Sequence, residues 1–417
     1  MNEIKSHLFE LIKMIIDKAN FIGWPSTQQY VVSRKEEYAP FADIEIDEKI
    51  NEELFLDEIR EEVWNMSPFN EIYKAIKSDE RLSNIFIVDA EGNPLDSIES
   101  ERAWLLGTII GFINDYLIKS KRELDVSTFD SLFQKLVREV ETNEIINVKI
   151  SPLYNLQLRI EQVEFTENLK IRKLTNEELE LWANSYIFPL RPDEISPLQC
   201  ALEIRYTTKR GTPITNEFHT LQDQVIQTLR LYFNTNIYVP FTYESCDSYF
   251  DRVVMHNADV PERMRDRLEY IEDKKSIEIL NIWTLLQYGI NKSKLTLALR
   301  RWSNSFGRSS LHDKIIDYWI GFESLITPDS NQEIKFRASL RIAKYIGDNQ
   351  INRQQIFERI KKSYDRRSEI VHGSLKERTD LNEISEYTGR YLQTTMLKIL
   401  FSEEEFNPIS IDLSLID

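Results

Sequence analysis

The segment RQQIFERIKKSYDRRSEIVHG, residues 353–373, predicts the fold of the C-terminal part of this chain. Its apolar side chains recur at the spacing of a helix with one buried face: Ile356, Ile360, Tyr364 and Val371. Gly373 follows where helices often end. Arg367 shares the apolar stripe, because it lies one helical turn from apolar residues on either side. Since a guanidinium stays charged and is costly to bury alone, we expect Arg367 to contact an anion.

Around this segment, residues 276–417 show only helical patterns. The predicted helices are 276–290, 295–306, 312–326, 334–347, 353–372 and 381–401. Residues typical of helix ends separate them. Gly347 and Gly373 fit C-terminal caps, and Pro328 follows a helix end. Asp380 with Glu383 marks the start of the last helix. Short connections between long amphipathic helices predict an antiparallel bundle.

The predicted helix 312–326 offers a counterion for Arg367. Its core stripe is expected to run through Ile316, Trp319 and Ile320, and Glu323 falls on the same face. A carboxylate and a guanidinium on apolar stripes of one bundle are expected to meet. The pair is either part of a functional site or simply an interhelical ion pair, and spacing alone leaves both interpretations open.

His372 adds a titratable group near the end of the same helix. It lies five residues after Arg367, or about 140° around the helix, so the two side chains do not stack on one face. The helix C-terminus favours a protonated imidazole, and Glu369, about one turn earlier, could act in the same direction. A histidine that exchanges a proton beside a fixed cation suits phosphodiester transfer. With RNA, the substrate's own 2′-hydroxyl would be the nucleophile, so we expect no metal and no other cofactor.

These residues resemble a known family. The segment RSEIVH, residues 367–372, resembles the Rx4-6H motif of HEPN domains, and YDRRSEIVHG resembles the ApeA-like branch. The upstream segments ALRRWSNSFGR, IIDYWIGFESLI and FRASLRIAKYIG resemble that branch in the same order, so the resemblance covers roughly residues 294–400. VEFTENLKIRKLTNEELELW, residues 163–182, is similar to a segment found upstream of such domains.

The resemblance implies a metal-independent endoribonuclease with an all-helical domain that dimerises, so that two motifs face each other across a cleft. It assigns Arg367 to phosphate contact and His372 to acid–base work, with Ser368 at a position where many members carry Asn, Asp or His. It also implies a role in bacterial antiviral defence, abortive infection or a toxin system, acting on tRNA or mRNA. Two alternatives stay open: a non-catalytic HEPN module that binds RNA or protein, and nucleotide transfer onto a partner protein.

Basic side chains near the motif are candidates for the RNA backbone. They are Arg353, Arg359, Lys361, Lys362, Arg366 and Lys376. A solvated helix face interleaved with acids explains them equally well. Trp302 and Tyr364 could stack on bases, although packing in the core is the simpler interpretation for each.

Composition limits the class of protein. The net charge of −17 over 417 residues argues against a broadly basic surface for indiscriminate DNA binding, but allows a local basic patch. Two distant cysteines, Cys200 and Cys246, suggest neither a disulfide framework nor a zinc site. The longest apolar run, residues 103–113, is too short to span a membrane, and the N-terminus does not suit a signal peptide. We therefore expect a cytoplasmic protein.

The rest of the chain is expected to form two further regions, which makes the overall class α+β. Residues 1–144 predict mainly helices, with a strand and turn at 85–94 and solvated helix faces along the acidic run 43–62. Residues 145–275 predict a mixed α+β domain of short strands, with a capping box at Thr175 and Glu178. Together they would form a sensor or regulatory part, with a phage-derived trigger or a regulatory partner as the expected signal, ahead of the all-α bundle at 276–417.

Overall fold

The computed structural model describes residues 1–34, 41–88, 93–142, 144–184, 191–209, 217–246, 248–249, 254–257, 267–327, 334–374 and 380–413. The chain divides into two compact units, each assembled from three segments. The first unit contains Met1–Ser151, Leu174–Thr215 and Phe241–Asn257, and the second contains Pro152–Lys173, Asn216–Pro240 and Ala258–Asp417. Helices and strands occur in both units, as the predicted α+β class requires, and the predicted region 145–275 is shared between them.

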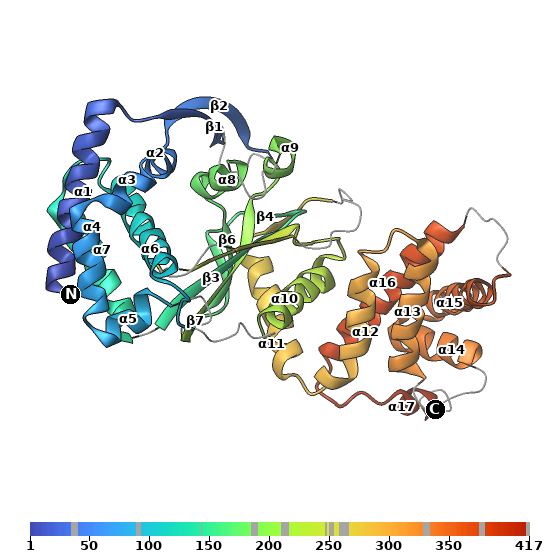
Figure 1. The fold of residues 1–417 in the computed structure, drawn as a ribbon. Helices are drawn as coiled ribbons and strands as arrows, with labels where there is room; N and C mark the ends of the chain where they lie inside the picture. Colours follow the sequence, from blue (N-terminus) through green and yellow to red (C-terminus); the bar gives the residue numbers. More distant parts are fainter. Residues whose placement is uncertain are drawn as a thin grey trace. The chain divides into compact units, whose positions relative to one another are not determined.

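The N-terminal segment of the first unit is mainly helical (Figure 1). Its helices are α1 (Asn2–Ile22), α2 (Glu52–Glu58), α3 (Arg60–Asn65), α4 (Ser67–Lys77), α5 (Glu80–Phe86), α6 (Ile98–Lys119) and α7 (Val126–Thr142). They enclose an apolar core in which Leu11, Phe69 and Tyr116 are among the fully buried side chains. Within the described ranges, no helix is long and apolar enough to span a membrane.

The strands of the first unit form two groups. β1 (Ser26–Ser33) pairs with β2 (Asp43–Ile50) as an antiparallel ribbon. β7 (Cys200–Lys209), β3 (Glu144–Pro152), β8 (Phe241–Cys246) and β9 (Val254–Asn257) lie side by side in that order. Two short helices, α8 (Asn176–Ala183) and α9 (Pro192–Ile195), complete the unit, and α8 begins at the predicted Thr175–Glu178 capping box.

Two predictions for the N-terminal region are wrong. Residues 43–50 form β2 instead of a helix face, because Ile44 and Ile46 alternate with acidic residues, which is the two-residue period of a strand. The strand predicted at 85–94 is also absent at its start: Ile85 and Phe86 end helix α5, whose first turn is capped by the side chain of Asp79.

The second unit combines short strands with a long helical segment (Figure 1). β5 (Gln162–Thr166) and β6 (Leu169–Lys173) form an antiparallel hairpin, and β4 (Leu156–Leu158) pairs in parallel with β10 (Glu269–Ile271). The helices are α10 (Glu217–Phe233), α11 (Asp273–Tyr288), α12 (Lys292–Ser305), α13 (Leu311–Ile326), α14 (Ile334–Ile346), α15 (Gln350–Val371), α16 (Leu381–Leu400) and α17 (Pro408–Leu413). All six predicted C-terminal helices are present, and α17 was not predicted.

A shared apolar core holds α12 to α16 together. Trp302 and Trp319 are fully buried in it, as expected for Trp302. The indole of Trp302 donates to the carbonyl of Gly389 on α16 at 3.0 Å. Gly389 also allows a close approach of Tyr318 on α13, since a Cβ at this position would lie 2.8 Å from the Tyr318 ring.

Helix α17 is held to the bundle through a buried arginine. The side chain of Arg341 on α14 is fully buried, and its Nε and Nη2 lie 2.8 Å and 2.6 Å from the two carboxylate oxygens of Asp412 on α17. The third nitrogen of the guanidinium donates to the carbonyl of Ile326. This contact holds the pKa of Asp412 below the ordinary aspartate value, because the carboxylate accepts hydrogen bonds from Arg341.

Candidate functional site

Helix α15 carries the two predicted catalytic residues, but its buried face differs from the prediction. The buried residues are Ile356, Ile360, Ser363 and Arg366. Tyr364 is only half-buried, and Val371 is 51% exposed. The buried face therefore follows steps of three residues after Ile360, and Arg366 takes the place predicted for Arg367.

Arg367 lies at the edge of the bundle and contacts the predicted counterion. Its Nη2 is 3.4 Å from Oε1 of Glu323 on α13, and the side chains are 26% and 28% exposed respectively. The guanidinium also lies 5.8 Å from the ring centroid of Tyr364. The predicted contact between α13 and α15 is confirmed, although α13 buries Ile315 and Trp319 while Ile316 and Ile320 are only half-buried. Arg367 thus combines a fixed position with access to solvent.

His372 is the C-cap residue of α15. Its backbone N–H donates to the carbonyl of Ser368 at 3.0 Å, and the chain then turns at Gly373, whose φ is 65°. The side chain of His372 is exposed, and among the described residues it has no hydrogen-bond or ion-pair partner. An imidazole in this position can reach a substrate from solvent. Ser368, by contrast, is half-buried.

Two adjacent arginines precede His372 with spacings that fit the motif, and the structure separates their environments. Arg366 is 8% exposed, and its Nη1 donates to both carboxylate oxygens of Glu369 at 2.8 Å and 2.9 Å. Its Nη2 is 3.6 Å from Oδ2 of Asp380. Arg366 is therefore engaged by two carboxylates, and Arg367 is the more exposed of the two arginines. Glu369, predicted to influence His372, lies against Arg366 instead.

The other basic candidates are also engaged. Lys362 lies 3.0 Å from Oδ2 of Asp380, and this hydrogen bond lowers the pKa of that carboxyl from its ordinary value. Asp380 occupies the N-cap position of α16, yet its side chain makes no cap hydrogen bond there, because it is turned to α15. The ammonium of Lys361 lies 5.8 Å from the ring centroid of Phe357. Lys376 and Pro328 lie outside the described residues.

Arg353 and Arg359 make their own contacts within the bundle. The Nε of Arg353 donates to the carbonyl of Gly347 at 3.0 Å. The Nη1 of Arg359 donates to the hydroxyl of Tyr391 at 3.2 Å. Both arginines could still contact RNA. However, each already has a partner within the bundle, so they do not form a row of basic side chains that contacts solvent alone.

A buried hydroxyl network that sequence reasoning missed supports this end of α15. The indole of Trp319 on α13 donates to Oγ of Ser363 at 2.9 Å, and Ser363 lies 2.8 Å from the hydroxyl of Thr388 on α16. The Thr388 hydroxyl can also donate to the carbonyl of Ile384. A serine one helical turn after Ile360 was the available signal, since a hydroxyl buried beside apolar residues requires partners.

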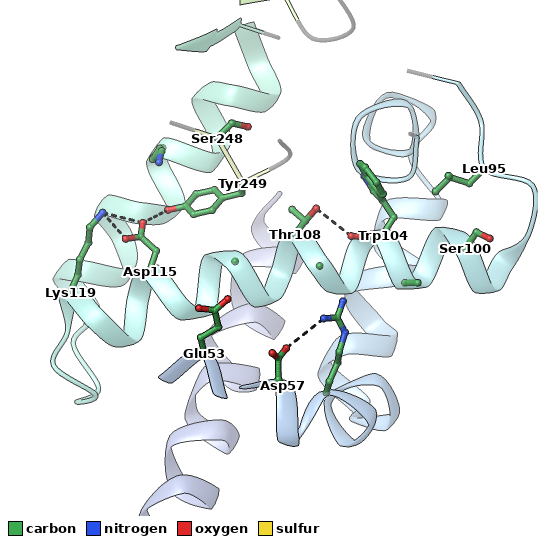
Figure 2. A pocket seen from close by; sticks show the side chains of 15 residues that line it. Glu53, Asp57, Leu95, Ser100, Trp104, Thr108, Asp115, Lys119, Ser248 and Tyr249 are labelled. Carbon is green, nitrogen blue, oxygen red and sulfur yellow. Dashed lines mark hydrogen bonds and ion pairs between the residues drawn. The ribbon is translucent and has the colours of Figure 1, made fainter. Parts of the chain in front are cut away.

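The first unit contains a separate cavity of about 1060 Å³ beside α6 (Figure 2). Ala103, Gly107 and Gly111 of α6 line it, and a Cβ built at either glycine meets no atom within 4 Å. Figure 2 shows Glu53 and Asp57 along one side of α6 and Tyr249 on the other. Here the hydroxyl of Tyr249 donates to Asp115 at 2.9 Å. Polar and apolar side chains line this open groove alike, whereas the sequence indicated only an apolar helix.

In the part of the chain that the structure describes, no group of three or more His, Cys, Asp or Glu side chains is placed to hold a metal ion. The arrangement at the end of α15 can instead supply a fixed cation and an accessible imidazole. No family model, curated protein or solved structure matches this chain.

Proposed function

We propose that this chain is a metal-independent endoribonuclease of the HEPN type, with Arg367 and His372 as its catalytic residues. The observation that carries the proposal is the contrast between the surroundings of Arg367 and those of His372 at the end of α15. Arg367 is held by Glu323 yet remains one-quarter exposed, and His372 is exposed at the C-cap. A charge fixed in place and a titratable group open to solvent are what general acid–base cleavage of a phosphodiester requires.

The proposed reaction needs only the substrate and these side chains. The 2′-hydroxyl of RNA attacks the adjacent phosphorus, and the bond from phosphorus to the 5′-oxygen breaks. His372 exchanges a proton with the attacking or leaving oxygen, while Arg367 donates hydrogen bonds to the nonbridging oxygens as charge develops. The products are a 2′,3′-cyclic phosphate and a 5′-hydroxyl end.

A dimer would solve a geometric problem within one protomer. Five residues along a helix separate Arg367 from His372 by about 7.5 Å of rise and about 140° of rotation. A two-fold axis near the end of α15 would bring the same patch from both protomers together, so that the arginine of one could act with the histidine of the other. We propose a cytoplasmic homodimer that cuts tRNA or mRNA within a bacterial defence or toxin system.

The direct test is cleavage of RNA by purified protein in the presence of EDTA. We expect 2′,3′-cyclic phosphate ends with the wild type, and none with Arg367→Ala or His372→Ala. His312→Ala is a matched control, because His312 is an exposed histidine on α13 away from the end of α15. Cleavage that persists in either site variant would remove that residue from the mechanism.

The contact between Arg367 and Glu323 also favours a second candidate function, a non-catalytic HEPN module in which the pair is structural. In that case Arg367→Ala would lower the melting temperature, while RNA would stay intact with the wild type at every protein concentration. Gel-shift binding of RNA or of a partner protein would then be the remaining activity to measure.

A further inference from the structure

The second half of α15 is anchored by polar contacts in addition to apolar packing by the partly buried Tyr364 and Ile370. Up to Ile360 the buried residues of α15 include isoleucines, whereas beyond it they are Ser363 and Arg366. Val371, which would close the helix against the core, is 51% exposed. In the last turns, which carry Arg367 and His372, hydrogen bonds and ion pairs therefore contribute to the position of the helix together with the apolar contacts of Tyr364 and Ile370.

Asp380 is one of the polar anchors that reach α15 from outside this helix, and it contacts two basic residues there. Its Oδ2 lies 3.0 Å from Nζ of Lys362 and 3.6 Å from Nη2 of Arg366, which are four residues apart on one face of α15. Arg366 in turn holds Glu369. The contacts thus connect Asp380 to the turn that ends at His372.

Burial indicates that this anchor is fixed. The side chain of Arg366 is 10% exposed and that of Asp380 is 26% exposed. Nε of Arg366 and Oδ1 of Asp380 are both buried without a hydrogen-bond partner among the described residues. Lys362 and Asp380 are partly exposed, but a phosphate from RNA that replaced Asp380 would have to reach the buried guanidinium of Arg366, so a permanent contact between Asp380 and Arg366 suits the geometry better than a displaceable one.

We propose that Asp380 is a positioning residue, which through Lys362 and Arg366 holds the last turns of α15 in the orientation that His372 needs for catalysis. This inference rests on the proposed ribonuclease function. Asp380 itself does not touch RNA. Its loss should therefore lower kcat and leave KM for RNA unchanged, because the ground-state contacts of the substrate remain.

The experiment compares Asp380→Asn and Asp380→Glu with Asp365→Asn as a matched control, since Asp365 on α15 pairs with Lys335 at a half-exposed position. We expect kcat to fall about 10- to 100-fold for Asp380→Asn, as misplacement of a catalytic group can do. Asp380→Glu should recover part of the loss, and the control should stay within about twofold of the wild type, as expected for an exposed pair. Hydrogen exchange at the amides of His372 and Ser374, which donate to Ser368 and Glu369, should be faster only in Asp380→Asn.

Several results would overturn the proposal. Unchanged kcat and unchanged exchange in Asp380→Asn would show that the anchor does not position the helix end. A rise in kcat would show that Asp380 restrains the enzyme. If the wild type cuts no RNA, the proposed ribonuclease function fails, and the role of Asp380 in catalysis fails with it. If the wild type cuts RNA and Asp380→Asn has the same kcat, only the inference about Asp380 is refuted.

Discussion

Replacing Asp412 by alanine should destabilise the second unit far more than removal of an ordinary surface carboxylate. Asp412 forms an ion pair with Arg341, whose side chain is fully buried. Asp412→Ala would remove the two hydrogen bonds that this carboxylate accepts from Nε and Nη2 of the buried guanidinium. Because the guanidinium of Arg341 cannot lose its proton, the lost interaction lowers the free energy of unfolding.

The magnitude follows from burial. Breaking a buried ion pair typically costs about 3–5 kcal/mol. The side chain of Asp412 is 36% exposed, so water can partly replace it, and we expect a loss nearer about 2–3 kcal/mol. For a folding unit of roughly 200 residues this corresponds to a fall in melting temperature of about 4–12 °C.

Thermal unfolding followed by calorimetry or circular dichroism measures the effect. Asp365→Ala is the control, because its partner Lys335 is 35% exposed and such a pair contributes at most about 1 kcal/mol. The double variant Arg341→Met, Asp412→Ala should regain part of the lost stability, since it also removes the buried positive charge of Arg341. Equal shifts for Asp412→Ala and Asp365→Ala would refute the argument from burial.

Three further predictions concern other contacts. Ser363→Ala should cost about 1–3 kcal/mol by denaturant unfolding, because the buried indole N–H of Trp319 loses its acceptor; an unchanged unfolding midpoint would contradict the network. Gly107→Ala and Gly111→Ala should each stabilise the protein by about 0.5–1 kcal/mol in the same assay, because both glycines lie in a helix and an added Cβ meets nothing; destabilisation would mean that the open groove is closed in solution. The pKa values of Asp380 and Asp412 are lowered by their basic partners, so the stability they contribute is present above the ordinary aspartate value of 3.8 and is lost as pH falls through the lower folded values. The slope of melting temperature against pH below about 4 should therefore be shallower in Asp412→Asn than in the wild type, and equal slopes would contradict the assignment.

The helices of the C-terminal segment could be predicted because several local signals agree there. Apolar spacing, caps such as Gly373 and short connections all indicate the same boundaries, and α11 to α16 follow them closely. The contact between Arg367 and Glu323 could be predicted because a charged side chain on an apolar stripe requires an opposite charge nearby. These inferences depend on residues near one another in sequence or on a simple pairing rule.

The neighbouring Arg366 shows where such reasoning ends. Consecutive residues lie about 100° apart on a helix, so a small rotation of the buried face exchanges one for the other. Spacing alone did not reveal that Arg366 is buried, nor that Asp380 turns away from its own helix to meet it. Both facts depend on how α16 packs against α15, which is a tertiary property.

The acidic run at 43–62 shows a different cause of error. Its charge suggested a solvated helix, but alternation of isoleucine and acid over 43–50 was the stronger signal, and β2 pairs with β1 along its whole length. The cavity beside α6 could not be predicted, because its wall at Tyr249 comes from a segment more than a hundred positions away in the chain.

The connection between α14 and α17 has a practical consequence for anyone who isolates the helical bundle. A shortened version that stops before Pro408 would retain the buried Arg341 but discard the carboxylate of Asp412, which accepts two of its hydrogen bonds. Such a fragment is expected to express poorly or aggregate for a reason unrelated to its enzymology. Domain boundaries for biochemical work should therefore include the whole of α17.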